Sequence, residues 1–198
     1  MSILSGTSVQ WQCDPIGDAP RVYFANHASH LDFVLIWTSL PRRARRCVRP
    51  VAGRDYWDKS PARRFVAGHV FHAVLIDRGG DASTARLSLA RMADEVDEHR
   101  SLIVFPEGTR SRDGEIGVFK SGLFHLARLR PEAELIPVYV DNMHRVLPKG
   151  ECLPVPMLSR VIFGPPLGAI ADEDKQAFLA RARGALLQLR GGHGAAAN

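Results

Sequence analysis

The sequence has few cysteines and no long apolar run. Its three cysteines, Cys13, Cys47 and Cys152, are widely spaced and form no CxxC pair, which argues against a disulfide framework or a zinc site and suits a reducing cytoplasm. The first 20 residues lack the basic start and continuous apolar stretch of a signal peptide. The most apolar stretches, 31–40 and 66–76, are shorter than the roughly 20 residues that span a bilayer. We therefore expect neither an export signal nor a transmembrane helix.

The composition is that of an ordinary folded protein. With 198 residues, 45% of them hydrophobic and 24% charged, the chain matches neither a disordered tail nor a collagen-like repeat, and we expect a single domain over residues 1–198. The 26 basic residues outnumber the 21 acidic ones, for a net charge of +5. This balance favours anionic partners.

Short apolar strands alternate with helices along the chain. The pattern predicts strands at 21–25, 48–52, 70–76, 102–105, 135–140 and 160–163, and helices at 31–40, 83–100, 121–130 and 172–190, with Ser83 or Thr84 as the cap of the second helix. This order indicates an α/β fold with a mostly parallel or mixed central sheet flanked by helices. Ligands gather where polar corners follow the strands of such a sheet, and three corners qualify: NHASHLD, DRGG and PEGTRSRDG.

The first corner holds His27 and, five residues later, Asp32. A turn can bring this carboxylate onto the imidazole, which would orient the ring as a general base for a hydroxyl. A helix N-cap box is the alternative, because Ser29 and Asp32 fit the pattern S-x-x-D. The same spacing recurs at His72 and Asp77, but it lies within an apolar run, so we expect His72 to be a packed histidine.

The third corner, FPEGTRSRDG, suits a phosphate monoester. Gly108 lets the backbone approach a ligand closely, Thr109 supplies a hydroxyl, and Arg110 supplies a bidentate fork. Glu107 would repel a phosphate, so it is expected to orient Arg110 or a hydroxyl. Arg78, at the end of the predicted strand 70–76, is a further candidate phosphate fork. A solvated turn and a surface arginine are the corresponding alternatives.

A strongly basic segment runs from Arg42 to Arg64. It contains eight Arg and one Lys against two Asp, a net charge of +7 that exceeds the charge of the whole chain. Interleaved aromatic residues make it amphipathic, as expected for a segment that rests on an anionic bilayer. A nucleic-acid groove would carry similar charge, but no nucleic-acid motif lies nearby. A solvated basic face is the remaining alternative.

Together these residues resemble the glycerophospholipid acyltransferase family. The family's first block matches residues 26–32 as NHxSxxD, the second matches VLIDR at 74–78, the third matches FPEGTRS at 105–111, and the fourth matches the proline-containing strand LIPVYV at 135–140. The first and third blocks are specific, whereas the second and fourth would be weak alone. The resemblance extends over about residues 21–165.

The resemblance implies an O-acyltransferase of phospholipid biosynthesis. It would move a fatty acyl group from acyl-CoA or acyl carrier protein to a hydroxyl of a glycerol phosphate lipid, first of all 1-acylglycerol-3-phosphate. No metal, bound cofactor or nucleic acid is implied. Carried over residue by residue, His27 is the base and Asp32 fixes its tautomer, Pro137 shapes the acyl-donor side, and the acceptor phosphate is held by Arg78, Glu107, Gly108, Thr109 and Arg110.

Many members of that family carry N-terminal hydrophobic anchors, and no such segment precedes Arg21 here. We therefore expect a cytoplasmic protein, peripheral at the inner face of the membrane and attached through the basic segment, an amphipathic surface or a partner. Glycerol 3-phosphate and another lyso-lipid, such as a lyso-ornithine lipid, stay open as acceptors. The functional alternatives are a non-catalytic lipid-surface binding module and a hydrolase that gives the acyl group to water.

Overall fold

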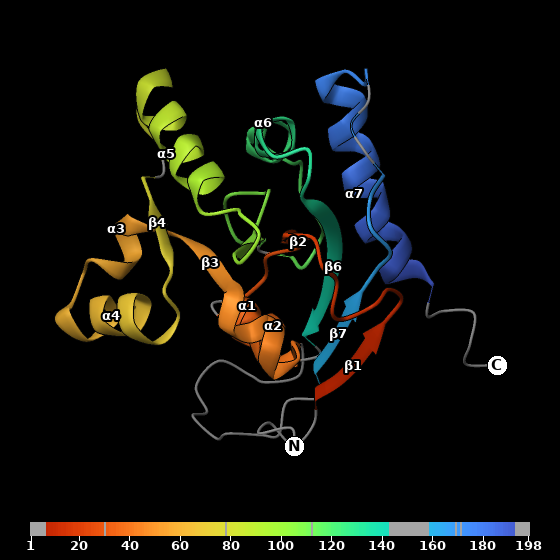
Figure 1. Ribbon diagram of the computed structural model, residues 1–198, viewed down its shortest axis with the longest axis horizontal. Coiled ribbons are helices and arrows are strands. Elements are labelled where there is room, and N and C mark those ends of the chain that lie inside the picture. Colours follow the sequence, from red (N-terminus) through yellow and green to blue (C-terminus); the bar gives the residue numbers. More distant parts are fainter. Residues whose placement is uncertain are drawn as a thin grey trace.

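A seven-stranded mixed sheet forms the centre of the protein (Figure 1). The structure is a computed structural model and describes residues 7–29, 31–77, 79–111, 113–142, 159–168, 170 and 172–192. Arg78 and Cys152 lie outside the described residues. In chain order the strands are β1 (Thr7–Trp11), β2 (Arg21–Ala25), β3 (Val48–Gly53), β4 (Val74–Ile76), β5 (Ser101–Val104), β6 (Glu134–Asn142) and β7 (Ser159–Phe163).

The strands lie side by side in the order β1-β7-β6-β2-β5-β3-β4. The five strands from β6 to β4 are mutually parallel, β7 is antiparallel to β6, and β1 is parallel to β7. This arrangement confirms the α/β fold and the mixed sheet predicted from the sequence. The extent of the domain, residues 1–198, stays a prediction.

Helices cover both faces of the sheet. They are α1 (Asp32–Ser39), α2 (Arg42–Cys47), α3 (Arg54–Trp57), α4 (Pro61–Phe65), α5 (Ala82–Asp94), α6 (Gly122–Leu129) and α7 (Lys175–Gly191), with a π-helical turn, η1, at Val66–Val70. In Figure 1, α5, α6 and α7 stand together at the top of the view, while α1 and α2 lie lower. No helix in the described part of the chain combines the length and apolarity needed to span a bilayer.

Strand β2 shows how the two faces are built. All five of its residues are buried, as its continuous apolar run RVYFA requires of a central strand. Val22 and Phe24 join the core formed with α5, α6 and α7, while Tyr23 and Ala25 join the core formed with α1. The alternation follows from the period of two along a strand.

The sequence-based prediction was wrong at three places. Residues 70–76 do not form one strand, because the chain turns at Phe71 and His72 and only Val74–Ile76 pairs with β3. Helix α5 ends at Asp94 rather than Arg100, and a turn closed by a bridge between Asp97 and Arg100 follows it. Its cap is Asp81, whose carboxylate accepts the N–H of Thr84, and not Ser83 or Thr84.

Four short elements in the first third of the chain were not predicted. β1 is an edge strand with mostly exposed residues, so it carries no apolar run. Helices α2, α3 and α4 contain four to six residues each and lie in the basic segment, where charged residues obscure a helical period.

Candidate active site

Two polar corners meet at the carboxyl edge of the sheet. The first corner begins at Asn26 after β2, and the other begins at Phe105 after β5; the two strands are paired and parallel. A hydrogen bond ties the corners together, because the backbone N–H of Ser111 donates to the carbonyl oxygen of His27 at 2.7 Å. The first and third predicted corners are therefore one site, at the place where parallel α/β sheets bind their ligands.

His27 and Asp32 form a hydrogen-bonded pair. Nδ1 of His27 lies 3.0 Å from Oδ2 of Asp32, whose side chain is fully buried. The same oxygen accepts the backbone N–H groups of Ala28 and Ser29, each at 2.7 Å. Asp32 is also the first residue of α1, so the helix start fixes the carboxylate. The N-cap of α1 is Leu31, without a side-chain cap hydrogen bond, so the cap box suggested by Ser29 and Asp32 is not how this helix begins.

These contacts determine which nitrogen of His27 can act as a base. Oδ2 of Asp32 is an acceptor for two backbone N–H groups, so Nδ1 of His27 must be the donor in the third contact. Nε2 is left with a lone pair. The ring stacks on Phe105 with 4.2 Å between ring centroids, and its side chain keeps 12% of its surface exposed. A packed, partly exposed ring that is oriented through Nδ1 is the arrangement that a general base needs.

Asn26, in the first corner, extends the sheet with its side chain. Its amide nitrogen donates to the carbonyl oxygen of Val140 at 2.9 Å, and its amide oxygen accepts the N–H of Val140 at 2.8 Å. The residue is buried, so both polar groups are satisfied within the protein. This pair holds the backbone immediately before His27 against β6. The sequence analysis did not single out Asn26 as a positioning residue.

The Glu107 carboxylate connects the two corners. Its Oε1 accepts the backbone N–H of His27 at 3.0 Å, and its Oε2 accepts that of Gly117 at 2.9 Å. The residue is 7% exposed. Both of these bonds are to backbone groups, rather than to Arg110 or to a hydroxyl as the sequence suggested. Glu107 thus positions His27.

Gly108 makes the sharp turn after Glu107. Its φ is +71°, a region that side-chain-bearing residues rarely adopt, and its N–H donates to the carbonyl oxygen of Phe105 at 3.0 Å. A Cβ here would lie 2.8 Å from Nζ of Lys120. Lys120 therefore brings a second cation to the corner that carries Arg110. Lys120 was not predicted as a phosphate ligand from the sequence, although it lies only nine positions after Ser111.

Of the remaining predicted phosphate ligands, the structure describes Thr109 and Arg110. Both residues are exposed, and Arg110 lines the cleft described next together with His27. Arg78 is outside the described residues, and its place in the site stays a prediction. Asp77, immediately before it, pairs with Arg54 at 3.2 Å.

A cleft of about 310 Å³ opens beside His27; it is hereafter called the acyl cleft, after the acyl group whose transfer the sequence resemblance implies. His27, Phe105 and Arg110 are among the residues that line it. The lining also includes an aromatic wall: Phe71 meets Phe33 edge-on at 4.8 Å between ring centroids, and Tyr56 and Trp57 line the cleft together with the acidic Asp55. A mostly apolar lining with a few polar groups is typical of a site for an amphipathic ligand. Sequence reasoning missed this wall, because its members come from α1, α3 and the turn after η1.

Pro137 does not line the acyl cleft. It is buried in β6 opposite Phe24 of β2, and its carbonyl oxygen accepts the N–H of Gly164 at 2.8 Å. A Cβ at Gly164 would lie 2.9 Å from the Pro137 ring, so the strand pair packs closely here. The structure thus places Pro137 in the sheet, and its predicted influence on the acyl donor remains untested.

His72 and Asp77, which share the five-residue spacing of His27 and Asp32, do not form a pair. His72 is exposed and has a φ of +48°, so the expectation of a packed histidine was wrong. The reason is that the chain leaves the π-helical turn η1 at this point, before β4 begins. Asp77 instead contacts Arg54.

The fold and the paired His–Asp site at its carboxyl edge define an α/β protein with the residues of a general base. The chain belongs to the acyltransferase family, because a family model of that description matches residues 11–141. The human 1-acyl-sn-glycerol-3-phosphate acyltransferase alpha is 31% identical over 179 residues, which cover 85% of this chain and 58% of that protein. The enzyme of the same name from Limnanthes douglasii is 29% identical over 150 residues, 74% of this chain and 50% of that protein.

A solved structure supports the fold independently. The crystal structure of PlsC, the 1-acyl-sn-glycerophosphate (LPA) acyltransferase from Thermotoga maritima, superimposes with a TM-score of 0.63 and 18% sequence identity, over 98% of this chain and 75% of that one. The chain described here spans about half the length of the curated relatives it matches.

Proposed function

We propose that this protein transfers a fatty acyl group from a thioester donor to the free hydroxyl of 1-acylglycerol-3-phosphate. The observation that carries the proposal is the His27–Asp32 pair, which engages Nδ1 and leaves Nε2 for the acceptor hydroxyl, on a ring that lines the acyl cleft. The relatives named for this reaction are similar over most of this chain.

His27 would act as the general base. Nε2 takes the proton of the acceptor hydroxyl, whose oxygen attacks the thioester carbonyl carbon and forms a tetrahedral intermediate. That intermediate collapses, the C–S bond breaks, and the proton passes to the departing thiolate. Asp32 keeps Nδ1 protonated and stabilises the imidazolium. A thioester is already activated, so this chemistry requires neither a metal nor a bound cofactor.

The acceptor phosphate would bind on the corner after β5. Arg110 and Thr109 present a guanidinium and a hydroxyl beside His27, and Lys120 adds a charge next to Gly108. Arg78 is proposed as a further ligand. In 1-acylglycerol-3-phosphate the reacting hydroxyl and the phosphate sit on neighbouring carbons, so the two groups need sites this close together. Glycerol 3-phosphate and other lyso-lipids remain alternative acceptors.

The segment from α3 to η1 would dock on an anionic membrane surface at the cytoplasmic face. Phe65 is 59% exposed and Val70 is 46% exposed, and the charged Arg63 and Arg64 directly precede Phe65. Leu31, at the mouth of the acyl cleft, is 47% exposed. Exposed apolar side chains among arginines suit the boundary between lipid headgroups and acyl chains. This position would let a lipid acceptor enter the site directly.

The experiment is product analysis with purified protein. Acyl-CoA and acyl carrier protein are each offered with 1-acylglycerol-3-phosphate, glycerol 3-phosphate and a lyso-ornithine lipid, and released thiol and acylated lipid are both measured. His27→Ala is assayed beside the wild type and should lose about 10²-fold to 10⁴-fold in rate.

An acylated lipid that disappears with His27→Ala supports the proposal and identifies the acceptor. Thiol release without acylated lipid would replace transfer by hydrolysis. Binding to anionic vesicles without turnover of either donor would favour the binding-module alternative.

A further inference from the structure

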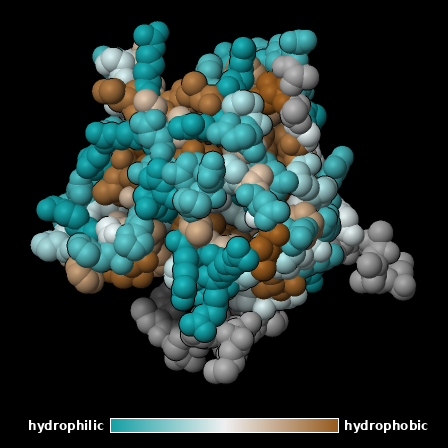
Figure 2. Space-filling model, in the orientation of Figure 1, coloured by the Kyte–Doolittle hydropathy of each residue, from teal (hydrophilic) through white to brown (hydrophobic). Residues whose placement is uncertain are grey.

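A second pocket, of about 440 Å³, lies on the α1 side of the sheet. We call it the arginine pocket; it is lined by Trp37, Arg42, Arg45, Arg46, Val48, Arg49, Val70, Phe71 and His72. No acidic residue is among these. In Figure 2 the surface over α2, which carries three of the arginines, is hydrophilic, with hydrophobic side chains nearby.

The arginine pocket adjoins the acyl cleft. Phe71 lines both pockets, and its ring meets Phe33 in the cleft and Trp37 in the arginine pocket, both edge-on. Along β3, residues 48–49 line the arginine pocket and residues 50–52 line the cleft. A long ligand could therefore extend from His27 past Phe71 into the arginine pocket.

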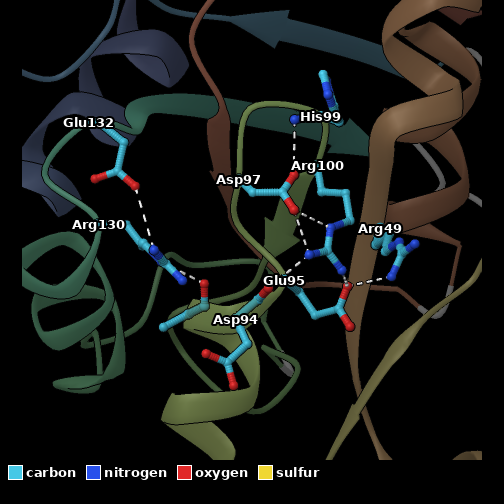
Figure 3. A network of polar contacts seen from close by, with 9 residues as sticks. Arg49, Asp94, Glu95, Asp97, His99, Arg100, Arg130 and Glu132 are labelled. Carbon is cyan, nitrogen blue, oxygen red and sulfur yellow. Dashed lines mark hydrogen bonds and ion pairs between the residues drawn. The ribbon is translucent and has the colours of Figure 1, made fainter.

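Three of the four arginines contribute uncompensated charge. Arg49 is paired with Glu95, which also accepts a hydrogen bond from Arg100 at 2.8 Å (Figure 3). Arg42 and Arg46 are exposed, and neither makes an ion pair with a carboxylate in the described part of the chain. A pocket with this excess of positive charge favours an anion with several negative oxygens.

Arg45 is held in place in this pocket. Its Nη2 donates to the carbonyl oxygens of Thr38 and Leu40 at 2.8 and 3.0 Å, and its guanidinium lies 5.0 Å from the ring centre of Trp37. Its Nε is buried and has no hydrogen-bond partner in the described part of the chain. A guanidinium held in this way carries its positive charge at a fixed place in the pocket lining, which favours a bound anion.

We propose that the arginine pocket binds the phosphate end of the donor's 4′-phosphopantetheine arm, the group that acyl-CoA and acyl carrier protein share. This inference rests on the proposed function. The alternative ligand, the acceptor phosphate, sits one carbon away from the reacting hydroxyl and must stay beside His27. Trp37 lies five residues beyond Asp32 on α1, about 7.5 Å farther along the helix axis. Only the donor separates its phosphate from its reacting carbon by a long arm.

The test compares donors with and without phosphate. The double variant Arg42→Gln/Arg46→Gln removes two charges from the arginine pocket, and both side chains are exposed. With a phosphate-bearing donor, its kcat/KM should fall at least about tenfold, mostly through KM, as expected for lost charged hydrogen bonds. With the corresponding S-acyl-pantetheine, which lacks the phosphate, kcat/KM should stay within about twofold of the wild type.

The matched control is Arg43→Gln/Arg86→Gln. Arg43 lies on the same helix α2 but faces a different pocket, near Pro20 and His99, and Arg86 is exposed on α5. The control makes the same change in net charge and should leave the kcat/KM of both donors unchanged. Equal losses for both donors, or equal losses in both double variants, would overturn the proposal.

Two further measurements distinguish donor-phosphate binding from the alternative roles of the arginine pocket. The first is calorimetric titration with free CoA, which needs no turnover. CoA binding should weaken in Arg42→Gln/Arg46→Gln and persist in His27→Ala, and unchanged binding in the double variant contradicts the proposal.

The second concerns the other ligands of the same double variant. A raised KM for the acceptor would assign the pocket to the acceptor phosphate, and lost sedimentation with anionic vesicles would assign it to the membrane surface. A wild type that binds CoA but acylates nothing would refute the proposed function and leave the phosphate site standing.

Discussion

Oδ2 of Asp32 lies 3.0 Å from Nδ1 of His27 and also accepts two backbone N–H groups from the turn between them. The carboxylate therefore holds the loop and the imidazole together. Its position at the first residue of α1 ties this arrangement to the start of a helix packed on the sheet. The spacing of five residues is thus a consequence of a single tight corner between β2 and α1.

Asp32→Asn should separate the two roles of this side chain. The amide oxygen can still accept N–H groups from Ala28 and Ser29, so the fold should persist. The amide is neutral, however, so it no longer stabilises the imidazolium that forms when Nε2 takes the proton, and kcat should fall about a thousandfold with little change in KM. Steady-state kinetics and circular dichroism measure the two effects. A variant that retains kcat within a few-fold would remove Asp32 from the mechanism.

Much of this site was predictable, because its parts lie close together in sequence. The His27–Asp32 pair and the glycine turn at Gly108 are local features, and local spacing carries them. The acyl cleft was not predictable, since Phe33 and Phe71 come from separate elements and meet only after folding. Likewise, no local pattern indicated that the Glu107 carboxylate would accept the backbone N–H of His27, 80 residues away.

The basic segment, Arg42 to Arg64, illustrates a second limit of sequence-based prediction. Its charge was evident, and an anionic partner followed from that charge alone. The structure divides its arginines between distinct surroundings: Arg49 pairs with Glu95, Arg54 pairs with Asp77, and Arg42 opens onto a pocket. Charge counts cannot make this distinction, because partners such as Glu95 lie far away in the sequence.

Gly108→Ala should destabilise the protein by about 1–2 kcal/mol, because a left-handed backbone conformation is costly for a residue with a Cβ. The new methyl group would also displace Lys120, whose Nζ lies 2.8 Å from the Cβ position. The matched control is Gly184→Ala, in α7, where a Cβ meets nothing within 4 Å and the helix should gain up to about 1 kcal/mol. Urea denaturation of both variants checks the difference. Equal stabilities would show that the turn relaxes freely.

The turn after α5 should make the fold sensitive to acid. Arg100 and the backbone N–H of His99 donate to the Asp97 carboxylate and lower its pKa from 3.8 to about 2, the Arg100 hydrogen bond contributing most. Because the folded-state pKa is the lower one, this stabilisation is complete above about pH 4 and is lost as the pH falls toward 2. Asp97→Asn removes the titrating group.

Denaturant unfolding at several pH values measures this effect. Over that window the free energy of unfolding should decline more steeply for the wild type than for Asp97→Asn. Parallel curves would mean that the Asp97 contacts add nothing to stability. The carboxylate is solvent-exposed, so the difference should also shrink at high salt.

Arg110→Ala should discriminate between acceptors rather than donors. The guanidinium lines the acyl cleft beside His27, so its loss should reduce kcat/KM for 1-acylglycerol-3-phosphate at least about tenfold and for 1-acylglycerol, which lacks the phosphate, within about twofold. Arg91→Ala, at an exposed position on α5, is the charge-matched control and should change neither value. The measurement is initial rate against acceptor concentration at saturating donor. Equal losses with both acceptors would make Arg110 a structural residue and move the acceptor phosphate to Lys120 or Arg78, because these are the remaining cations proposed to bind it.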